Sequence, residues 1–240
     1  MGGPGSKATA NVLLDSTGGS IGEVAIVGCT IQHAHDAPDS ANIRINGESL
    51  ARPFTKETRH GNVTIADNVL SDVQVNVDLA NTRGVTVTGN TMWKGYQYNL
   101  RVNNVDGLVV SNNVFDRNPR YHYGDGAEAA NGLVFTESDG CTMSGNHIQG
   151  STTEPASVVV KRCRRFNITN CTILDCSTTG LLLEDVTHSR VSDCLIHSDH
   201  ATENSHAIRV TGGSGNMIVD NLLGDRYSIP EKSAHTAGNK

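Results

Sequence analysis

Aromatic and charged side chains that could contact a sugar are concentrated between residues 44 and 125. The only Trp and four of the five Tyr lie between positions 93 and 123. Flat aromatic rings bury the C–H faces of sugars, while charged and amide groups bind sugar hydroxyls and carboxylates. The residues predicted to contact a polysaccharide are Arg44, Asn76, Trp93, Tyr96, Arg120, Tyr121, Tyr123 and Asp125.

The same segment offers groups for catalysis. Elimination from a uronic acid needs a base for the proton next to the carboxylate and a cation for the developing charge. Arg101 can be that base only if neighbouring cations such as Arg44 lower its pKa; otherwise it pairs with a carboxylate such as Asp78. His122, between two tyrosines, is the more conventional base. The predicted catalytic residues of a polysaccharide lyase are therefore Arg101, His122 and Asp78.

Other chemistries use other groups. A glycoside hydrolase needs two facing carboxylates, and no recognisable spacing selects a pair among Asp78, Asp116, Asp125 and Glu128. Histidines near positions 33 and 197 have ligand types but fall in different loops, so they cannot share one ion. The sequence predicts no metal site and no cofactor, with calcium held by aspartates of the turns as the alternative.

A repeated pattern must position these residues. The pattern is apolar-x-apolar-x-x-(Asn or Cys)-x-apolar, and its anchor residues recur about every 27 positions, a spacing typical of stacked solenoid coils. The eight anchors are Cys29, Asn68, Asn90, Asn113, Asn146, Cys171, Cys194 and Asn221. Each copy alternates with a second short apolar run, such as residues 42–45, bounded by turn residues. The fold class is therefore all-β, and each coil holds at least two strands.

These repeats resemble the right-handed parallel β-helix superfamily of pectate-lyase-like proteins, over roughly residues 11–224. The resemblance implies a single-stranded parallel β-helix of about eight coils, and no individual enzyme family matches. It also implies a carbohydrate-active protein outside the cytoplasm: extracellular, periplasmic or on the cell surface. The function alternatives are a polysaccharide lyase in a groove of coils two to four, a glycoside hydrolase using an Asp/Glu pair, and a non-catalytic glycan-binding or structural fragment of a larger surface protein.

The anchor residues are predicted to face the core. Asn can hydrogen-bond the backbone of adjacent turns, and Cys can replace it as a compact apolar side chain. Four of the six cysteines occupy inward positions of the repeat, so we expect unpaired, mostly buried thiols and no disulfide.

Alternation along the second strand predicts what it shows to solvent. Arg44, Asn76, Asp78 and Arg101 are expected to point outward in neighbouring coils. In later coils the same stripe becomes apolar, with Val134, Val159 and Leu182, and we expect a loop, the C-terminal tail or a second chain to cover it. Extra residues are expected on one side of the solenoid, which is then the binding face. They fall at residues 33–41, 48–60, 117–130, 150–156 and 197–206.

Composition favours one domain at residues 11–224, after a flexible lead-in or cloning remnant at 1–10 and before a tail at 225–240 that could pack on the helix. The net charge of −6 argues against nucleic-acid binding, and no 18-residue apolar run could span a bilayer. The start lacks the charged and apolar regions of a signal peptide. The expected partner is a polysaccharide, with self-association or a missing N-terminal segment as a further way to cover the apolar stripe.

Overall fold

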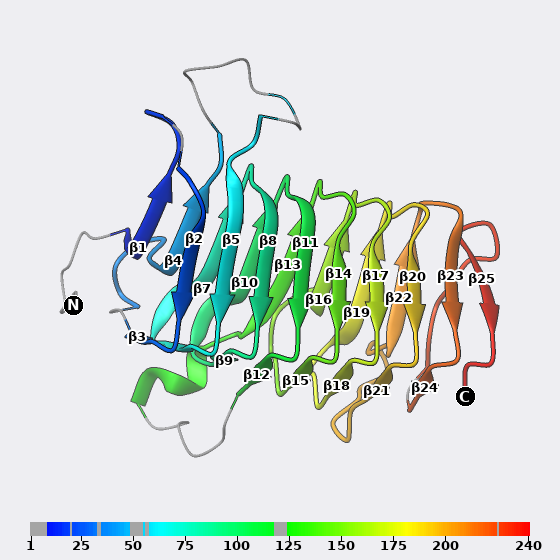
Figure 1. The fold of residues 1–240 in the computed structure, drawn as a ribbon. Coiled ribbons are helices and arrows are strands. Elements are labelled where there is room, and N and C mark those ends of the chain that lie inside the picture. The colour runs from blue at the N-terminus through cyan, green and yellow to red at the C-terminus, as the bar shows by residue number, and fades with distance from the viewer. Residues whose placement is uncertain are drawn as a thin grey trace.

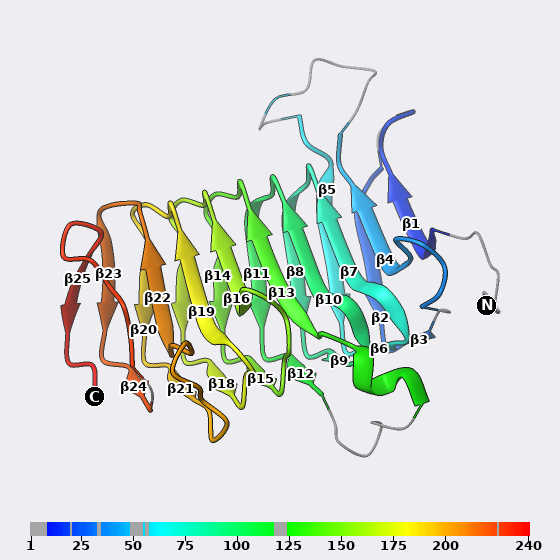
Figure 2. The same ribbon diagram turned by 180° about the vertical axis from the view of Figure 1, so that it is seen from behind.

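The computed structural model describes residues 9–19, 21–32, 35–48, 55, 58–117, 124–224 and 226–240, which form a parallel β-helix with three strands in each coil (Figure 1). Every strand pair is parallel, and the chain passes from sheet A to sheet B to sheet C before it returns to sheet A. Sheet B is nearest the viewer in Figure 1, and sheet A in Figure 2. The predicted fold is confirmed.

The strands are as follows. Sheet A contains β1 (Ala10–Asp15), β4 (Ala41–Asn46), β7 (Val73–Ala80), β10 (Gly95–Asn103), β13 (Gly132–Thr136), β16 (Ala156–Lys161), β19 (Thr179–Glu184) and β22 (Ile208–Thr211). Sheet B contains β2 (Val24–Val27), β5 (Gly61–Ala66), β8 (Arg83–Thr88), β11 (Asp106–Ser111), β14 (Thr142–Ser144), β17 (Asn167–Thr169), β20 (Arg190–Ser192), β23 (Asn216–Val219) and β25 (Ala234–Ala237). Sheet C contains β3 (Thr30–Gln32), β6 (Val69–Ser71), β9 (Thr91–Met92), β12 (Val114–Asp116), β15 (His147–Gln149), β18 (Thr172–Leu174), β21 (Leu195–His197) and β24 (Leu222–Leu223).

The anchor residues form a ladder at the corner between sheets B and C. The Asn113 side chain donates to Val87 O at 3.0 Å and to Asn146 Oδ1 at 3.0 Å, and its own Oδ1 accepts from Asn90 N and Nδ2. The residue before each anchor has positive φ, as in Gly89 at +66°, so the chain can turn sharply there. The predicted role of the anchor asparagines is confirmed.

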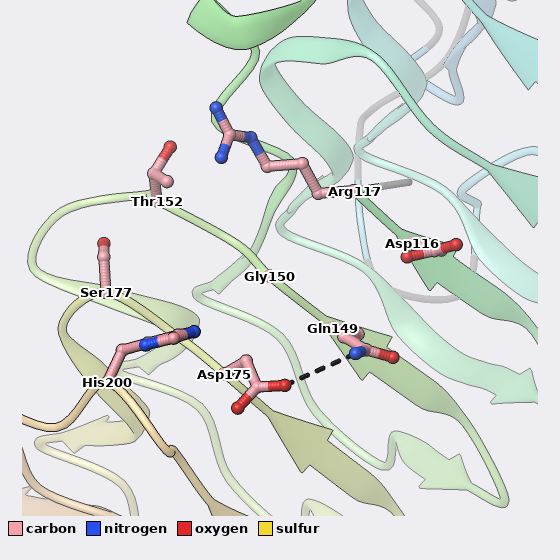
Figure 3. Close-up of a pocket in the computed structure, with 8 residues that line it drawn as sticks. All are labelled: Asp116, Arg117, Gln149, Gly150, Thr152, Asp175, Ser177 and His200. Atoms are coloured by element: carbon pink, nitrogen blue, oxygen red, sulfur yellow. Dashed lines mark hydrogen bonds between the residues drawn. The ribbon is translucent and has the colours of Figure 1, made fainter. Parts of the chain in front are cut away.

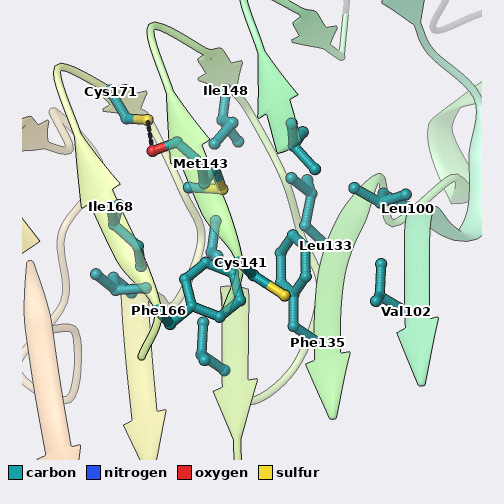
Figure 4. Packing of buried hydrophobic residues seen from close by; sticks show 14 of the residues in the cluster. Leu100, Val102, Leu133, Phe135, Cys141, Met143, Ile148, Phe166, Ile168 and Cys171 are labelled. Atoms are coloured by element: carbon teal, nitrogen blue, oxygen red, sulfur yellow. Dashed lines mark hydrogen bonds between the residues drawn. The ribbon is translucent and has the colours of Figure 1, made fainter. Parts of the chain in front are cut away.

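Inward side chains of all three sheets fill the core. Phe135 and Phe166 pack edge to face with ring centroids 5.1 Å apart, next to buried Cys141 and Met143 (Figure 4). The six cysteines are unpaired and five are buried, as predicted. The prediction that the anchor Cys29 faces the core was wrong, because Cys29 is exposed in the first coil, which has a neighbouring coil on one side only. Among the described residues, no helix is long and apolar enough to cross a membrane.

Extra residues gather mainly at one corner, where sheet C leads into sheet A. Four of the five predicted insertions fall between a strand of sheet C and the following strand of sheet A. The described part of one of them includes the 3₁₀ helix η2 (Gly124–Glu128), at the lower right of Figure 2. The insertion at 48–60 lies between β4 and β5, at the corner between sheets A and B, so its predicted placement was wrong. Periodicity could not distinguish the two corners, because both follow an apolar run.

The solenoid extends past residue 224, where the sequence predicted its end. Ser228 bridges Arg209 of sheet A, β25 pairs with β23, and Lys240 N donates to Asn221 O at 3.0 Å. The tail thus forms a further coil. Val159 and Leu182 of the apolar stripe are only 8% and 7% exposed in the single chain, with Val134 packed against them. The stripe is therefore covered largely within the chain itself.

Removing one anchor should destabilise the fold. Asn113→Ala leaves buried groups of the two neighbouring coils without partners, at about 1–3 kcal/mol per unsatisfied group. We expect urea unfolding to show a loss of roughly 2–4 kcal/mol in unfolding free energy. Asn167→Ala, on the outer face of sheet B, is the control and should change stability little; equal losses in the two variants would contradict the ladder's role.

Thiol reactivity should distinguish Cys29 from the other cysteines. Five of the six thiols are buried and out of reach of a reagent. Burial also raises the pKa of Cys141 to about 12 and that of Cys163 to about 11, whereas the hydrogen bond with Cys194 lowers the pKa of buried Cys171 to about 7. A thiol reagent should therefore titrate one thiol quickly in the native protein and six after denaturation without reductant. Cys29→Ser should remove the fast reaction. Several fast native thiols would show that the core is open.

Candidate functional site

The predicted outward charges of sheet A do lie side by side, but they neutralise one another. Strand register places Asp78 between Arg44 and Arg101. Asp78 accepts from Arg44 Nε at 2.8 Å and from Arg101 Nε and Nη2, both at 2.9 Å. Because both carboxylate oxygens are occupied, the structure supports the pairing alternative for Arg101.

A loop of the protein itself covers this face. Asp39, in the segment between β3 and β4, accepts from Arg101 Nη2 at 2.8 Å and from Arg44 Nη2 at 3.3 Å. In the same segment, the His35 ring stacks on Tyr96 with centroids 3.9 Å apart. In the described part of the predicted sugar-binding surface, Arg44, Arg101 and Tyr96 are therefore in contact with residues of the segment 35–40.

The neighbouring charges also shift the pKa of Arg101 in the direction that opposes the predicted chemistry. The hydrogen bond to Asp78 raises the pKa of Arg101, and Asp39 raises it further, although burial opposes both. Burial raises the pKa of Asp78, but the hydrogen bonds and charges of Arg101 and Arg44 outweigh it and lower that pKa overall. The pKa of Arg101 therefore moves away from the range a base needs, and the expectation that Arg44 would lower it was wrong.

Asn76 does not face solvent, contrary to the prediction. Its side chain is fully buried, and its Nδ2 donates to Trp93 O at 3.0 Å and to Asn99 Oδ1 at 2.7 Å. A second asparagine ladder, Asn11, Asn42, Asn76 and Asn99, thus runs along the corner between sheets C and A. Asn76 lies between the buried Val75 and Val77, as alternation predicts, but its hydrogen bonds hold its side chain in this buried ladder.

The remaining predicted contacts are only partly described. Trp93 is half-buried, and Lys94 Nζ lies 5.4 Å from its ring centroid. Arg120, Tyr121, His122 and Tyr123 lie outside the described residues, and only the backbone of Asp125 is described. The role predicted for these five residues stays a prediction.

A groove lies at the corner between sheets C and A, farther along the solenoid (Figure 3). Its volume of about 370 Å³ is within the roughly 300–1,000 Å³ typical of ligand sites. The lining comes from the ends of β12, β15 and β18 and from the loops that follow them and β21. The lining residues are Asp116, Arg117, Gln149, Gly150, Thr152, Asp175, Ser177 and His200.

Hydrogen bonds fix the polar groups of the groove. Gln149 Nε2 donates to Asp175 Oδ2 at 3.3 Å, and Asp199 N donates to Asp175 Oδ1 at 3.2 Å. Arg117 Nε donates to Ala129 O at 3.2 Å. Figure 3 shows His200 reaching into the groove from the loop after β21. The groove therefore offers carboxylates, a guanidinium, an amide and hydroxyls along several successive coils.

The sequence predicted which side of the solenoid carries the groove, but not which residues line it. Three predicted insertions, at 117–130, 150–156 and 197–206, contribute to its wall, and Asp116 was considered as a catalytic carboxylate. Gln149, Asp175 and Ser177 carried no signal of their own. Their approach depends on the register of three coils, in which Asp116 pairs with Gln149 and Gln149 with Leu174.

The described residues do not form a metal site. No group of three or more His, Cys, Asp or Glu side chains is arranged to hold an ion in that part of the chain. The thiols, the softest ligands, lie mostly in the apolar core.

The ion pairs of Asp78 should appear in the pH dependence of stability. Because the pKa of Asp78 is lower in the folded than in the unfolded chain, its pairs stabilise the fold above about pH 4 and lose this effect as the pH falls further. We expect Asp78→Asn to be less stable than wild type at pH 7 and to approach it near pH 2, measured by urea unfolding. The exposed Glu203→Gln should show no such convergence; a constant deficit in Asp78→Asn would contradict the assignment.

Comparisons with known proteins agree with the fold. The enzymatically active domain of tailspike protein 2 from bacteriophage CBA120 has a TM-score of 0.63 at 10% identity, covering 95% of this chain and 37% of that one. The full-length tailspike protein also gives 0.63 at 10%, with 95% and 33% covered. This chain thus spans about a third of those chains. The A-module of a mannuronan C-5 epimerase of Azotobacter vinelandii gives 0.41 at 13% identity, covering 99% and 87%.

Sequence comparison identifies the family. No curated protein matches this chain. The family model described as "Periplasmic copper-binding protein (NosD)" matches residues 14–239, which include almost the whole solenoid. The parallel β-helix of this chain is therefore that of a member of the NosD family.

Proposed function

We propose that this protein binds a segment of a polysaccharide in the groove between Arg117 and His200. The observation that carries the proposal is the groove itself, with polar side chains supplied by successive coils. The lining runs over four coils, so it extends roughly 14 Å along the axis at about 4.8 Å per strand. A linear polymer laid along the axis would meet similar polar groups at each coil.

The chemistry of the groove suits sugars. Asp116 and Asp175 are acceptors for sugar hydroxyls, while Thr152 and Ser177 can both donate and accept. The superfamily that the repeats resemble includes lyases, glycosidases and tailspikes on this scaffold, which supports a carbohydrate ligand by analogy. The family description places its namesake in the periplasm, and we place this chain in the periplasm or outside the cell on that basis.

Copper has no part in this proposal. The family description names copper, but the described residues do not fit a copper site, because no three of their His, Cys, Asp or Glu side chains converge. Five of the six cysteines that could bind Cu(I) are buried in the apolar core, and the exposed one, Cys29, stands in no such group of ligands.

Hydrolysis is the second candidate function, and a pair of carboxylates favours it. Asp116 and Asp175 line one groove. Asp116 ends β12 and Asp175 follows β18, and β15 lies between these two strands. Two strand spacings put their Cα atoms roughly 10 Å apart, a separation compatible with the roughly 6.5–9.5 Å between carboxyl groups in inverting hydrolases. One carboxyl group would protonate the leaving oxygen while the other activates water.

A bulky substitution in the groove should weaken oligosaccharide binding. We expect Ser177→Trp to raise the Kd for a bound oligosaccharide at least about 10-fold, or 1.4 kcal/mol, in calorimetric titrations against an oligosaccharide panel. Thr64→Trp, the same change on the outer face of sheet B, is the matched control and should bind like wild type.

Two outcomes would contradict the proposal: no binding by the wild type to any oligosaccharide, or equal binding by both Trp variants and the wild type. A reducing-sugar assay then separates the two candidates. Release of reducing ends that Asp175→Asn abolishes would establish the hydrolase, whereas binding without release would leave the protein a glycan-binding module.

A further inference from the structure

Arg117 has neutral hydrogen-bond partners, unlike the arginines that pair with carboxylates on this solenoid. Its Nε donates to Ala129 O at 3.2 Å, and its Nη2 donates to Ala127 O. Both acceptors are neutral backbone carbonyls in and just after η2. The two bonds hold the guanidinium plane in place, and several of its five N–H donors remain for a ligand.

Ion pairs elsewhere in the solenoid make this contrast clear. Arg44 and Arg101 share two aspartates, while Arg162, Arg165 and Arg190 pair with Glu137, Asp139 and Asp193. Among the residues that the structure describes, no carboxylate pairs with Arg117. Figure 3 shows its guanidinium extending away from the neighbouring Asp116.

Burial leaves the charge of Arg117 poorly compensated. Burial lowers its pKa. The group remains a cation at neutral pH, because the pKa of arginine starts above 12. A fixed, partly desolvated cation in a ligand groove attracts an anionic group more strongly than an exposed one does.

The rest of the groove restricts what that anion can be. Thr152 and Ser177 line the same space and can bind hydroxyls, whereas Asp116 and Asp175 would repel a ligand that carries negative charge along its whole length. A sugar with one planar carboxylate and several hydroxyls satisfies both sets of groups. A planar carboxylate also matches the planar fork of a guanidinium.

We propose that Arg117 binds the carboxylate of a uronic acid residue, so that the glycan of this groove is an acidic polysaccharide. This inference rests on the proposed function, since it names the class of glycan that the groove takes. Arg117, rather than Arg101 or Arg44, is thereby the arginine that contacts the glycan.

The test compares matched acidic and neutral glycans. Oligosaccharides that carry a single galacturonate, mannuronate, guluronate or glucuronate residue among neutral sugars are each titrated beside their carboxyl-reduced counterparts, using the full chain. At least one acidic oligomer should bind about 10-fold or more tightly than its neutral partner, the lower limit for a charge-assisted hydrogen bond. Arg117→Gln should remove this preference, so that acidic and neutral partners bind with similar affinity. Arg165→Gln, at the opposite corner, is the matched control.

Two further measurements keep the outcomes distinct. The preference of wild type should shrink as salt is raised, which tests the charge without any substitution. Equal affinity for acidic and neutral partners, with Ser177→Trp still weakening both, would overturn the inference and leave the proposed function standing. Failure of every oligomer to bind, or indifference to Ser177→Trp, would overturn the proposed function as well.

Discussion

The asparagine ladder between sheets B and C, which joins Asn68, Asn90, Asn113 and Asn146, is the constraint on which the rest of the structure depends. Each anchor amide bonds a backbone carbonyl of the preceding coil and the anchor of the next, as Asn90 does with Ile65 O and Asn113 Oδ1. Without these hydrogen bonds, the turn between sheets B and C would bury backbone donors and acceptors that have no partner. Because the ladder fixes the register of the coils that it joins, it also determines which residues meet at the other two corners, between sheets C and A and between sheets A and B.

That register places variation where the ladder does not reach. The B-to-C corner is uniform and closed, whereas the chain between sheets C and A varies in length from coil to coil. In the first half of the solenoid, the segment 35–40 lies on sheet A, where Asp39 and Asp78 neutralise two arginines. In the second half, the loops after β12, β15 and β18 leave a groove. Loops at the corner between sheets C and A therefore cover the outer face of sheet A in the first half of the solenoid and line a groove in the second half.

Sequence reasoning succeeded where one residue position reports one structural role. Anchors, inward apolar residues and buried cysteines follow from a repeat whose every copy makes the same contacts. It failed at Asn76, because alternation indicates on which side of the strand a residue lies, but not that asparagines of neighbouring coils bury it in a second ladder. It also could not foresee that Asp39 would reach Arg101, 62 positions away. The groove was missed because Gln149 and Asp175 become neighbours only through coil register.

The most direct measurement is a crystal structure of the full chain with a bound acidic oligosaccharide. The account predicts sugar rings along the corner between sheets C and A, with a carboxylate on Arg117 and hydroxyls near Asp175. A ligand on the outer face of sheet A, in place of the segment 35–40 and in contact with Arg44 and Arg101, would contradict it.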